Sequence, residues 1–202
     1  MKNLKILILF LGFSLLLFGC VGGQTDNLTS TDTVKQTEKQ TVDILDQFKS
    51  KDPDYTYYSS PLFLIYYPKD WQVDDQKTTP GVFEFIAPLE DDSDKISEEF
   101  LVQIWAGNQS SPEQFEAYER SLMVEGDIII QTENITYKGK SAFVIEMEGN
   151  NSDTGIHMVY KTLFFRNGEW AYRLNYGVEK SKISEYRPIM ENILDKFVIG
   201  SG

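Results

Sequence analysis

Two residue types that build catalytic and metal sites are almost missing from this chain. Its 202 residues contain one cysteine, Cys20, and one histidine, His157. A single cysteine excludes a disulfide within the chain, and one histidine without a second histidine or another cysteine does not make a zinc site of the usual kind. The sequence also has no Gly-rich phosphate loop, no Gly-x-Ser-x-Gly elbow and no internal repeat. We therefore predict a protein that is not an enzyme. An exported hydrolase with scattered Glu, Asp and Ser is the least favoured alternative.

Basic charge is scarce as well. The chain has 19 Lys and Arg residues against 31 Asp and Glu residues, which gives a formal net charge of −12 at pH 7. An acidic surface repels nucleic acid and anionic lipid headgroups. We therefore expect no nucleic-acid partner, and a membrane attachment that uses lipid rather than a basic patch.

Long apolar runs are limited to one segment. Residues 6–18 follow the basic Lys2 and Lys5 and are fewer than the ~20 residues that cross a bilayer, which is typical of a signal peptide. The run ends in Phe18-Gly19-Cys20, which resembles the lipobox of prokaryotic lipoproteins. The resemblance implies cleavage after Gly19, lipid on the sulfur of Cys20, and a protein anchored on the extracytoplasmic face of the cell membrane. The alternative is an uncleaved N-terminal anchor with an incidental cysteine.

The composition divides the chain into three parts. Residues 1–19 form the expected lipoprotein signal peptide, residues 20–51 a lipid-anchored polar tether, and residues 52–202 one domain. As random coil, the ~30 residues of the tether would span about 30 Å. Apolar residues at loosely helical spacing favour a short helix over residues 33–49, and a plain polar spacer is the alternative.

Alternating and β-rich runs predict strands in the domain. They cover residues 62–67, 82–87, 100–106, 128–137, 142–148, 157–165 and 169–176. Asn167-Gly168 between two such runs is a strong hairpin signal. Within the last run, Trp170, Tyr172, Leu174 and Tyr176 share one face, which we expect to be core rather than a ligand platform.

Two helices interrupt this pattern. Ser111 is a good N-cap for a helix over residues 112–125, which Gly126 should end. A second helix begins at Ser181 or Ser184 and reaches about Lys196, with Pro188 tolerated in its first turn if it begins at Ser184. Strands joined by short turns imply an antiparallel sheet. The predicted fold class is therefore α+β, an antiparallel β-sheet flanked by helices in an α/β/α sandwich.

The start of the domain resembles a known family. Residues 64–71, LIYYPKDW, combine a strand, Tyr67-Pro68 and Trp71 as PsbP-like domains do. The likeness continues through a Pro-capped helix, a turn at Gly139 and a C-terminal helix followed by Phe197, so that it covers roughly residues 55–199. It implies an antiparallel sheet between helices and a binding protein, like the extrinsic photosystem II subunits that help to retain calcium and chloride. Plant members dock through basic residues, so the net charge of −12 argues against photosystem binding here. We expect an accessory or binding subunit of a membrane or envelope complex.

One acidic loop offers a candidate metal site. Carboxylates gather at residues 90–94, and Ca²⁺ prefers six to eight oxygen ligands. We predict weak calcium binding by Asp91, Asp92 and Asp94, with no other cofactor, although a solvated loop is the simpler explanation.

A further alternative is a stand-alone ion- or ligand-binding module. It would use the acidic loop for calcium, or surface tyrosines for carbohydrate, the best candidates being Tyr55, Tyr57 and Tyr58.

Four Asn-x-Ser/Thr sequons occur, at Asn27, Asn108, Asn134 and Asn150. Asn27 and Asn150 lie in polar stretches that we expect to be exposed, so these two are candidate N-glycosylation sites in a host that has the machinery. Unmodified asparagine is the alternative at each.

Overall fold

The computed structural model describes residues 52–75, 81–91, 94–107 and 111–200. The expected signal peptide and tether, with Cys20 and Asn27, lie outside the described residues. No helix in the described ranges is long and apolar enough to cross a membrane. The ranges that are described fall within the domain predicted for residues 52–202.

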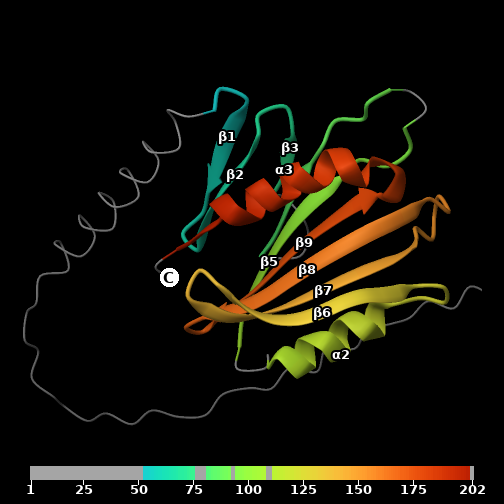
Figure 1. Cartoon of the computed structure of the whole chain (residues 1–202). Coiled ribbons are helices and arrows are strands. Elements are labelled where there is room, and N and C mark those ends of the chain that lie inside the picture. Colours follow the sequence, from blue (N-terminus) through green and yellow to red (C-terminus); the bar gives the residue numbers. More distant parts are fainter. Residues whose placement is uncertain (1–51, 76–80, 92–93, 108–110, 201–202) are drawn as a thin grey trace, which may run out of the picture.

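The strands form two antiparallel sheets (Figure 1). The smaller has the order β1-β2-β10 and consists of β1 (Tyr55–Ser59), β2 (Phe63–Pro68) and β10 (Val198–Ile199). The larger has the order β3-β4-β5-β9-β8-β7-β6. Its strands are β3 (Gln72–Asp74), β4 (Val82–Ile86), β5 (Glu99–Ala106), β6 (Ile128–Tyr137), β7 (Lys140–Asn150), β8 (His157–Asn167) and β9 (Trp170–Glu179).

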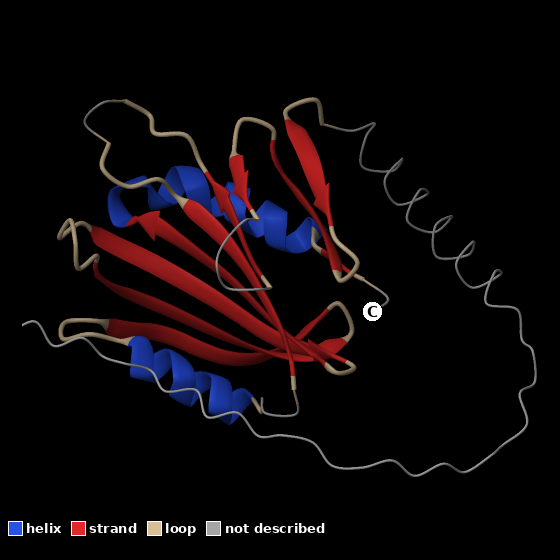
Figure 2. Ribbon diagram, turned by 180° about the vertical axis from the view of Figure 1, so that it is seen from behind, coloured by secondary structure: helices blue, strands red, loops and turns tan. Residues whose placement is uncertain are grey.

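Two helices cover opposite faces of the seven-stranded sheet (Figures 1 and 2). They are α2 (Pro112–Leu122) and α3 (Ile183–Lys196), the second preceded by the 3-10 turn η1 (Lys180–Lys182). Successive strand residues point to opposite faces, so Phe143 packs in the cluster under α2 while its neighbour Val144 packs in the cluster under α3. The predicted α+β fold, with helices on both sides of an antiparallel sheet, is confirmed.

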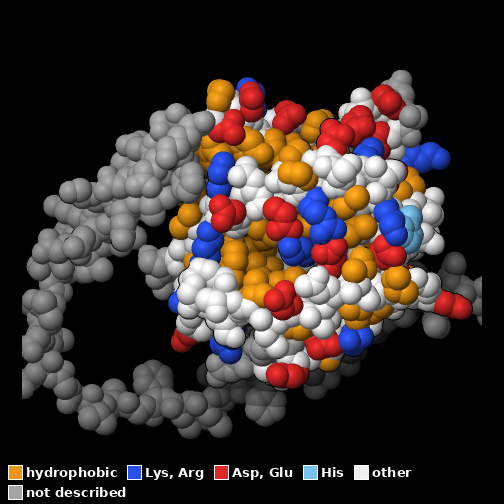
Figure 3. Space-filling view, in the orientation of Figure 1, with side chains coloured by type: hydrophobic (Ala, Val, Ile, Leu, Met, Phe, Trp, Pro, Cys, Tyr) orange, Lys and Arg blue, Asp and Glu red, His pale blue; other side chains and the backbone are white. Residues whose placement is uncertain are grey.

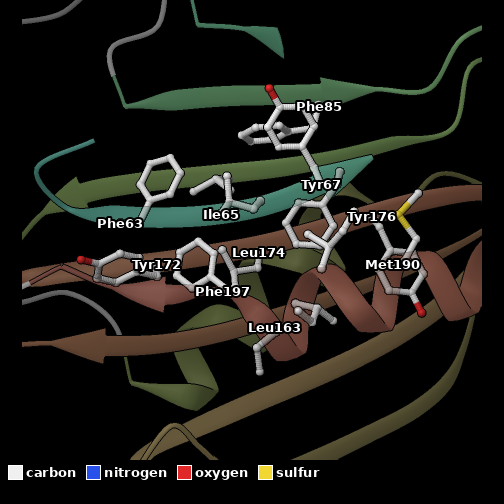
Figure 4. Close-up of a cluster of buried hydrophobic side chains, with 14 of the residues drawn as sticks. Phe63, Ile65, Tyr67, Phe85, Leu163, Tyr172, Leu174, Tyr176, Met190 and Phe197 are labelled. Atoms are coloured by element: carbon white, nitrogen blue, oxygen red, sulfur yellow. The ribbon is translucent and has the colours of Figure 1, made fainter. Parts of the chain in front are cut away.

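The larger core lies between α3 and both sheets (Figure 4). Met190 of α3 is fully buried and belongs to the same cluster as Tyr176 of β9. Phe197, directly after α3, stacks on Phe63 of β2 with 5.5 Å between ring centroids. This core therefore joins the C-terminal helix to the small sheet as well as to the large one.

Ion pairs hold α3 on the sheet. Arg187 donates to the two carboxylate oxygens of Glu146 at 3.2 and 2.6 Å. Lys161 Nζ lies 2.6 Å from Glu191 Oε1, and the hydroxyl of Tyr176 donates to the same oxygen at 3.0 Å. Acidic and basic side chains accordingly lie side by side across this face of the molecule (Figure 3).

The hairpin turns follow their sequence signals. Lys138 and Gly139 connect β6 to β7 with φ angles of 49° and 75°. Two consecutive positive φ angles are typical of a type I′ turn, whose twist matches that of the flanking strands. The hairpin predicted at Asn167-Gly168 is confirmed between β8 and β9, with Gly168 (φ 60°) as the first of its two central residues.

Some elements differ from the prediction. No pattern in the sequence predicts β1, β3 or β10, and α2 ends at Leu122 instead of residue 125. Because η1 leads directly into α3, the helix begins at Ile183, before Ser184. Pro188 therefore lies inside the helix and beyond its first turn, so its expected position is wrong. Proline has no N–H to donate to the carbonyl of Ser184.

Phe197→Ala is expected to lower the free energy of unfolding by roughly 3–5 kcal/mol, because it leaves a cavity beside Phe63 in the largest core. Urea denaturation measures the loss. Tyr118→Ala, which truncates an aromatic side chain that is half exposed, is the control and should change stability by less than about 1 kcal/mol. Equal losses for the two variants would contradict this view of the core.

Candidate functional site

A group of exposed apolar side chains runs from the end of α2 into β6. Six large hydrophobic side chains of the described residues are about half exposed, and all except Leu89 lie between Tyr118 and Ile130. We call the group the α2–β6 surface; it consists of Tyr118, Leu122, Val124, Ile128 and Ile130. Apolar side chains are visible over the start of β6 at the lower right of Figure 3. Several exposed apolar side chains within one short segment make the end of α2 and the start of β6 a candidate interaction site.

Strand β6 is the last strand of the seven-stranded sheet. It pairs with β7 on one side, and no strand in the described ranges pairs with its other side. The ladder with β7 is regular except for a shift between Ile129 and Gln131, which makes Ile130 a bulge residue. An unpaired strand edge presents N–H and C=O groups that can bond another strand, and bulges and charges limit indiscriminate pairing.

A hollow of about 280 Å³ lies between the end of α2 and the sheet. Leu122 and Val124 line it, so it adjoins the α2–β6 surface. Arg173 and Asn175 of β9 also line it, and both are less than a tenth exposed. The hollow therefore combines an apolar wall with a polar floor, as ligand and peptide pockets do.

The floor of the hollow is held by a buried ion pair. Arg173 Nε donates to Glu119 Oε1 at 2.7 Å and Nη2 donates to Oε2 at 3.1 Å, while Nη1 donates to Gln103 at 3.0 Å. The side chain of Glu119 is 1% exposed. Since its guanidinium is engaged by internal partners, Arg173 positions α2 on the sheet and is not a free catalytic group.

The predicted calcium ligands lie in the loop between β4 and β5. Asp92 lies outside the described residues, and Asp94 faces inward with Oδ2 2.9 Å from the ammonium of Lys182. A calcium ion at Asp94 would have to displace this ammonium. Within the described ranges, no group of three or more His, Cys, Asp or Glu side chains is placed to hold a metal ion. Calcium binding by Asp91, Asp92 and Asp94 stays a prediction.

Glu98, at the end of the same loop, is a buried carboxyl group. It is fully buried, and neither of its side-chain oxygens has a hydrogen-bond partner among the described residues. Lys182 Nζ lies 3.9 Å from Glu98 Oε1, closer to Glu90 and closest to Asp94. Burial raises the pKa of Glu98, whereas the bond from Lys182 lowers the pKa of Asp94. Burial and the nearby carboxylates Glu98 and Glu90 raise the pKa of Tyr186 to about 12.

The other predicted residues contact neighbouring side chains of the fold. His157 is the first residue of β8, as predicted, and its Nδ1 lies 2.9 Å from Asn150 Oδ1. Asn150 is exposed at the end of β7, and its glycosylation stays a prediction. Tyr55 and Tyr58 belong to β1 and lie against aromatic rings of β2, 5.1 Å from Tyr66 and 5.9 Å from Phe63. Carbohydrate binding by these tyrosines stays a prediction.

Sequence reasoning missed the polar residues that the fold brings together. Arg173 and Glu119 are separated by 54 positions, and Lys182 and Asp94 by 88. One signal was available, because Arg173 and Asn175 interrupt the apolar residues of β9 on a single face. A charged residue at an expected core position needs a partner, but the sequence does not name it.

The fold is shared with solved structures, although no family model and no curated protein matches the sequence. The cyanobacterial PsbP of Synechocystis sp. PCC 6803 is 15% identical, with 74% of this chain and 95% of that chain covered and a TM-score of 0.52. LpqN, described as involved in cell envelope biogenesis of Mycobacterium tuberculosis, is 13% identical over 77% and 95% of the two chains, with a TM-score of 0.53. At such identities the likeness shows the fold alone. The chain has a PsbP-like fold, as its resemblance to that family implied.

Glu119→Leu is expected to lower the free energy of unfolding by roughly 3–5 kcal/mol, because it leaves the buried charge of Arg173 without its carboxylate. The double variant Glu119→Leu/Arg173→Met should recover most of this loss. Glu116→Leu, which removes the partner of the half-exposed Arg120, is the matched control and should cost less than about 1 kcal/mol. Urea denaturation of the four proteins measures these differences, and a double variant as unstable as the single one would contradict the assignment.

Glu98→Gln is expected to stabilise the protein at neutral and alkaline pH. Because folding raises the pKa of Glu98, the folded state binds this proton more tightly than the unfolded chain does. The resulting stability is present below the usual carboxyl pKa and is lost as the pH rises through the raised value. Glutamine stays neutral, so Tm should increase at pH 8, by roughly 2–4 °C for each kcal/mol gained. The difference should vanish toward about pH 4.

Thermal unfolding of both proteins between these pH values, followed by circular dichroism, measures the effect. Glu169→Gln, at an exposed turn, is the control and should show no such pH dependence. A lower Tm for Glu98→Gln at every pH would mean that the ionised carboxylate stabilises the fold through Lys182.

Proposed function

We propose that this protein is a non-enzymatic, lipid-anchored binding protein on the extracytoplasmic face of the cell membrane, where it is an accessory or binding subunit of a membrane or envelope complex. The observation that carries the proposal is the α2–β6 surface, which collects nearly all of the exposed large hydrophobic side chains of the described residues beside an unpaired strand edge. Such a surface fits a protein whose task is to contact another protein.

The sequence before the domain supports the anchor. A lipobox-like ending places Cys20 where a lipid would be attached, and residues 20–51 would tether the domain about 30 Å from the headgroups. A single lipid-modified cysteine at the start of a mature chain attaches a protein to a membrane without a spanning helix. LpqN, which shares the fold, is described as involved in cell envelope biogenesis, in keeping with this location.

The use of charge supports a role in binding rather than catalysis. Ion pairs on both faces of the sheet hold the helices in place. Arg173 pairs with Glu119 of α2 on one face, and Lys161 pairs with Glu191 of α3 on the other. A catalytic carboxylate needs access to a substrate, whereas Glu119 is almost fully buried and Glu98 completely so. We propose accordingly that the protein needs no cofactor and recognises a protein surface rather than nucleic acid.

Mild crosslinking in native membranes, followed by purification through a C-terminal tag and mass spectrometry, tests the proposal. We expect reproducible enrichment of one membrane or envelope complex, and a mature N-terminal peptide that begins at lipid-modified Cys20. Cys20→Ser is the control, and it should release the protein from the membrane and abolish the enrichment. Membrane-bound protein with no enriched partner would contradict a subunit role, and turnover in a screen of ester, glycoside and peptide substrates would contradict a non-enzymatic one.

A further inference from the structure

The edge of β6 that no described strand pairs with has two different faces. Thr132 and Asn134 pair with residues of β7 in the cluster under α2, so their side chains lie on the α2 face. Glu133 pairs with Val144, which packs in the core under α3, so Glu133 lies on the α3 face. A strand added to this edge would continue the sheet at about 4.8 Å from β6 and place alternate side chains on these two faces.

The beginning of the edge is apolar on both faces. Ile129 packs against the cluster under α2, and Ile128, opposite Glu148 of β7, is 54% exposed on the α3 face. Leu122 and Val124 are half exposed nearby and open toward the hollow beneath α2. An added strand would therefore bury apolar area that the isolated domain leaves in water, which favours binding.

The same edge is acidic from its beginning to Glu133, whereas Lys138 follows its far end. Glu125 and Asp127 precede β6 and Glu133 lies within it, whereas the nearest cation on α2, Arg120, is already paired with Glu116 at 2.6 Å. A second copy of this chain would bring these carboxylates against their own equivalents, and like charges oppose pairing. Anionic headgroups are repelled for the same reason. Charge complementarity therefore selects a basic partner.

We propose that the free edge of β6 binds an extended segment of a partner protein by strand addition, and that this segment alternates apolar with basic residues. Main-chain hydrogen bonds to β6 provide the affinity. Apolar side chains pack on the α2 face beside Leu122 and Val124, and a lysine or arginine on the α3 face pairs with Glu133. This inference rests on the proposed function as a binding protein and names the surface and the chemistry of its partner.

The test uses the full-length protein in non-ionic detergent micelles and fluorescein-labelled octapeptides with blocked ends. One peptide alternates valine with lysine, a second alternates valine with glutamate, and a third is the lysine peptide with every backbone nitrogen methylated. Fluorescence anisotropy should show the lysine peptide binding at least about tenfold more tightly than either of the others. On its binding, amide hydrogen exchange should slow in residues 128–137.

Three variants locate the contact. Ile128→Lys should weaken binding of the lysine peptide about tenfold or more, because it places a like charge on the α3 face, where the lysines of the peptide lie. Leu89→Lys is the matched control, since Leu89 is equally exposed (54%) but lies elsewhere, and it should bind as the unmodified protein does. Glu133→Lys should shift the preference toward the glutamate peptide. All three positions are exposed, so an unchanged Tm confirms that the variants are folded.

Several outcomes would overturn the inference: equal binding of the lysine and glutamate peptides, binding that survives full N-methylation, or equal losses for Ile128→Lys and Leu89→Lys. Self-association that Ile128→Lys abolishes would make a second copy the occupant, and binding of anionic phospholipid vesicles lost in that variant would make it a membrane surface. If these peptide experiments fail while native-membrane crosslinking still captures one complex, the proposed function stands and only this inference is lost.

Discussion

Strand β9 is buried on both faces, and the rest of the structure depends on covering it. Residues 171–178 are all buried, so an apolar layer is required on each side. The α3 side of β9 is uniformly apolar or aromatic, with Tyr172, Leu174 and Tyr176 in one row. The α2 side carries Arg173, which can be buried only because Glu119 is delivered to it by α2. The helix α2 therefore both covers this face and compensates the charge of Arg173.

The layers that pack on the two faces of the large sheet differ in size, and this difference leaves the α2–β6 surface exposed. On one side α3 is joined by the small sheet, and both belong to a single core. On the other side α2 has 11 residues, about 16 Å of helix, across strands that reach about 37 Å. The chain leaves α2 at Leu122 and enters β6 at Ile128. The apolar side chains of this connection therefore have no further element of the described domain to pack against.

Local signals predicted the parts of the fold that depend on local chemistry. The capping box at Ser111 specifies the start of α2. The positive φ angle of Gly168, which few other residues tolerate, specifies the turn between β8 and β9. Strand β10 has two residues and exists because β2 lies beside it, so no periodicity could reveal it. Tyr55 is predicted to be a surface residue. Its stacking on Tyr66, with 5.1 Å between ring centroids, results from the pairing of β1 with β2. The candidate site was hidden for the same reason, since edge position is a property of sheet order and not of the sequence of β6.

Charge explains how an apolar strand edge can stay exposed on this domain. Across the α3 face, carboxylates and cations are paired, so they add little field outside the protein. At the β6 edge the balance is acidic, with Asp127 and Glu133 at either side of the bulge at Ile130. Bulges and charges are the devices by which natural edge strands resist indiscriminate pairing. The bulge and the carboxylates do not prevent every strand from pairing with β6. A strand with basic residues is attracted by the carboxylates that repel another copy of the chain.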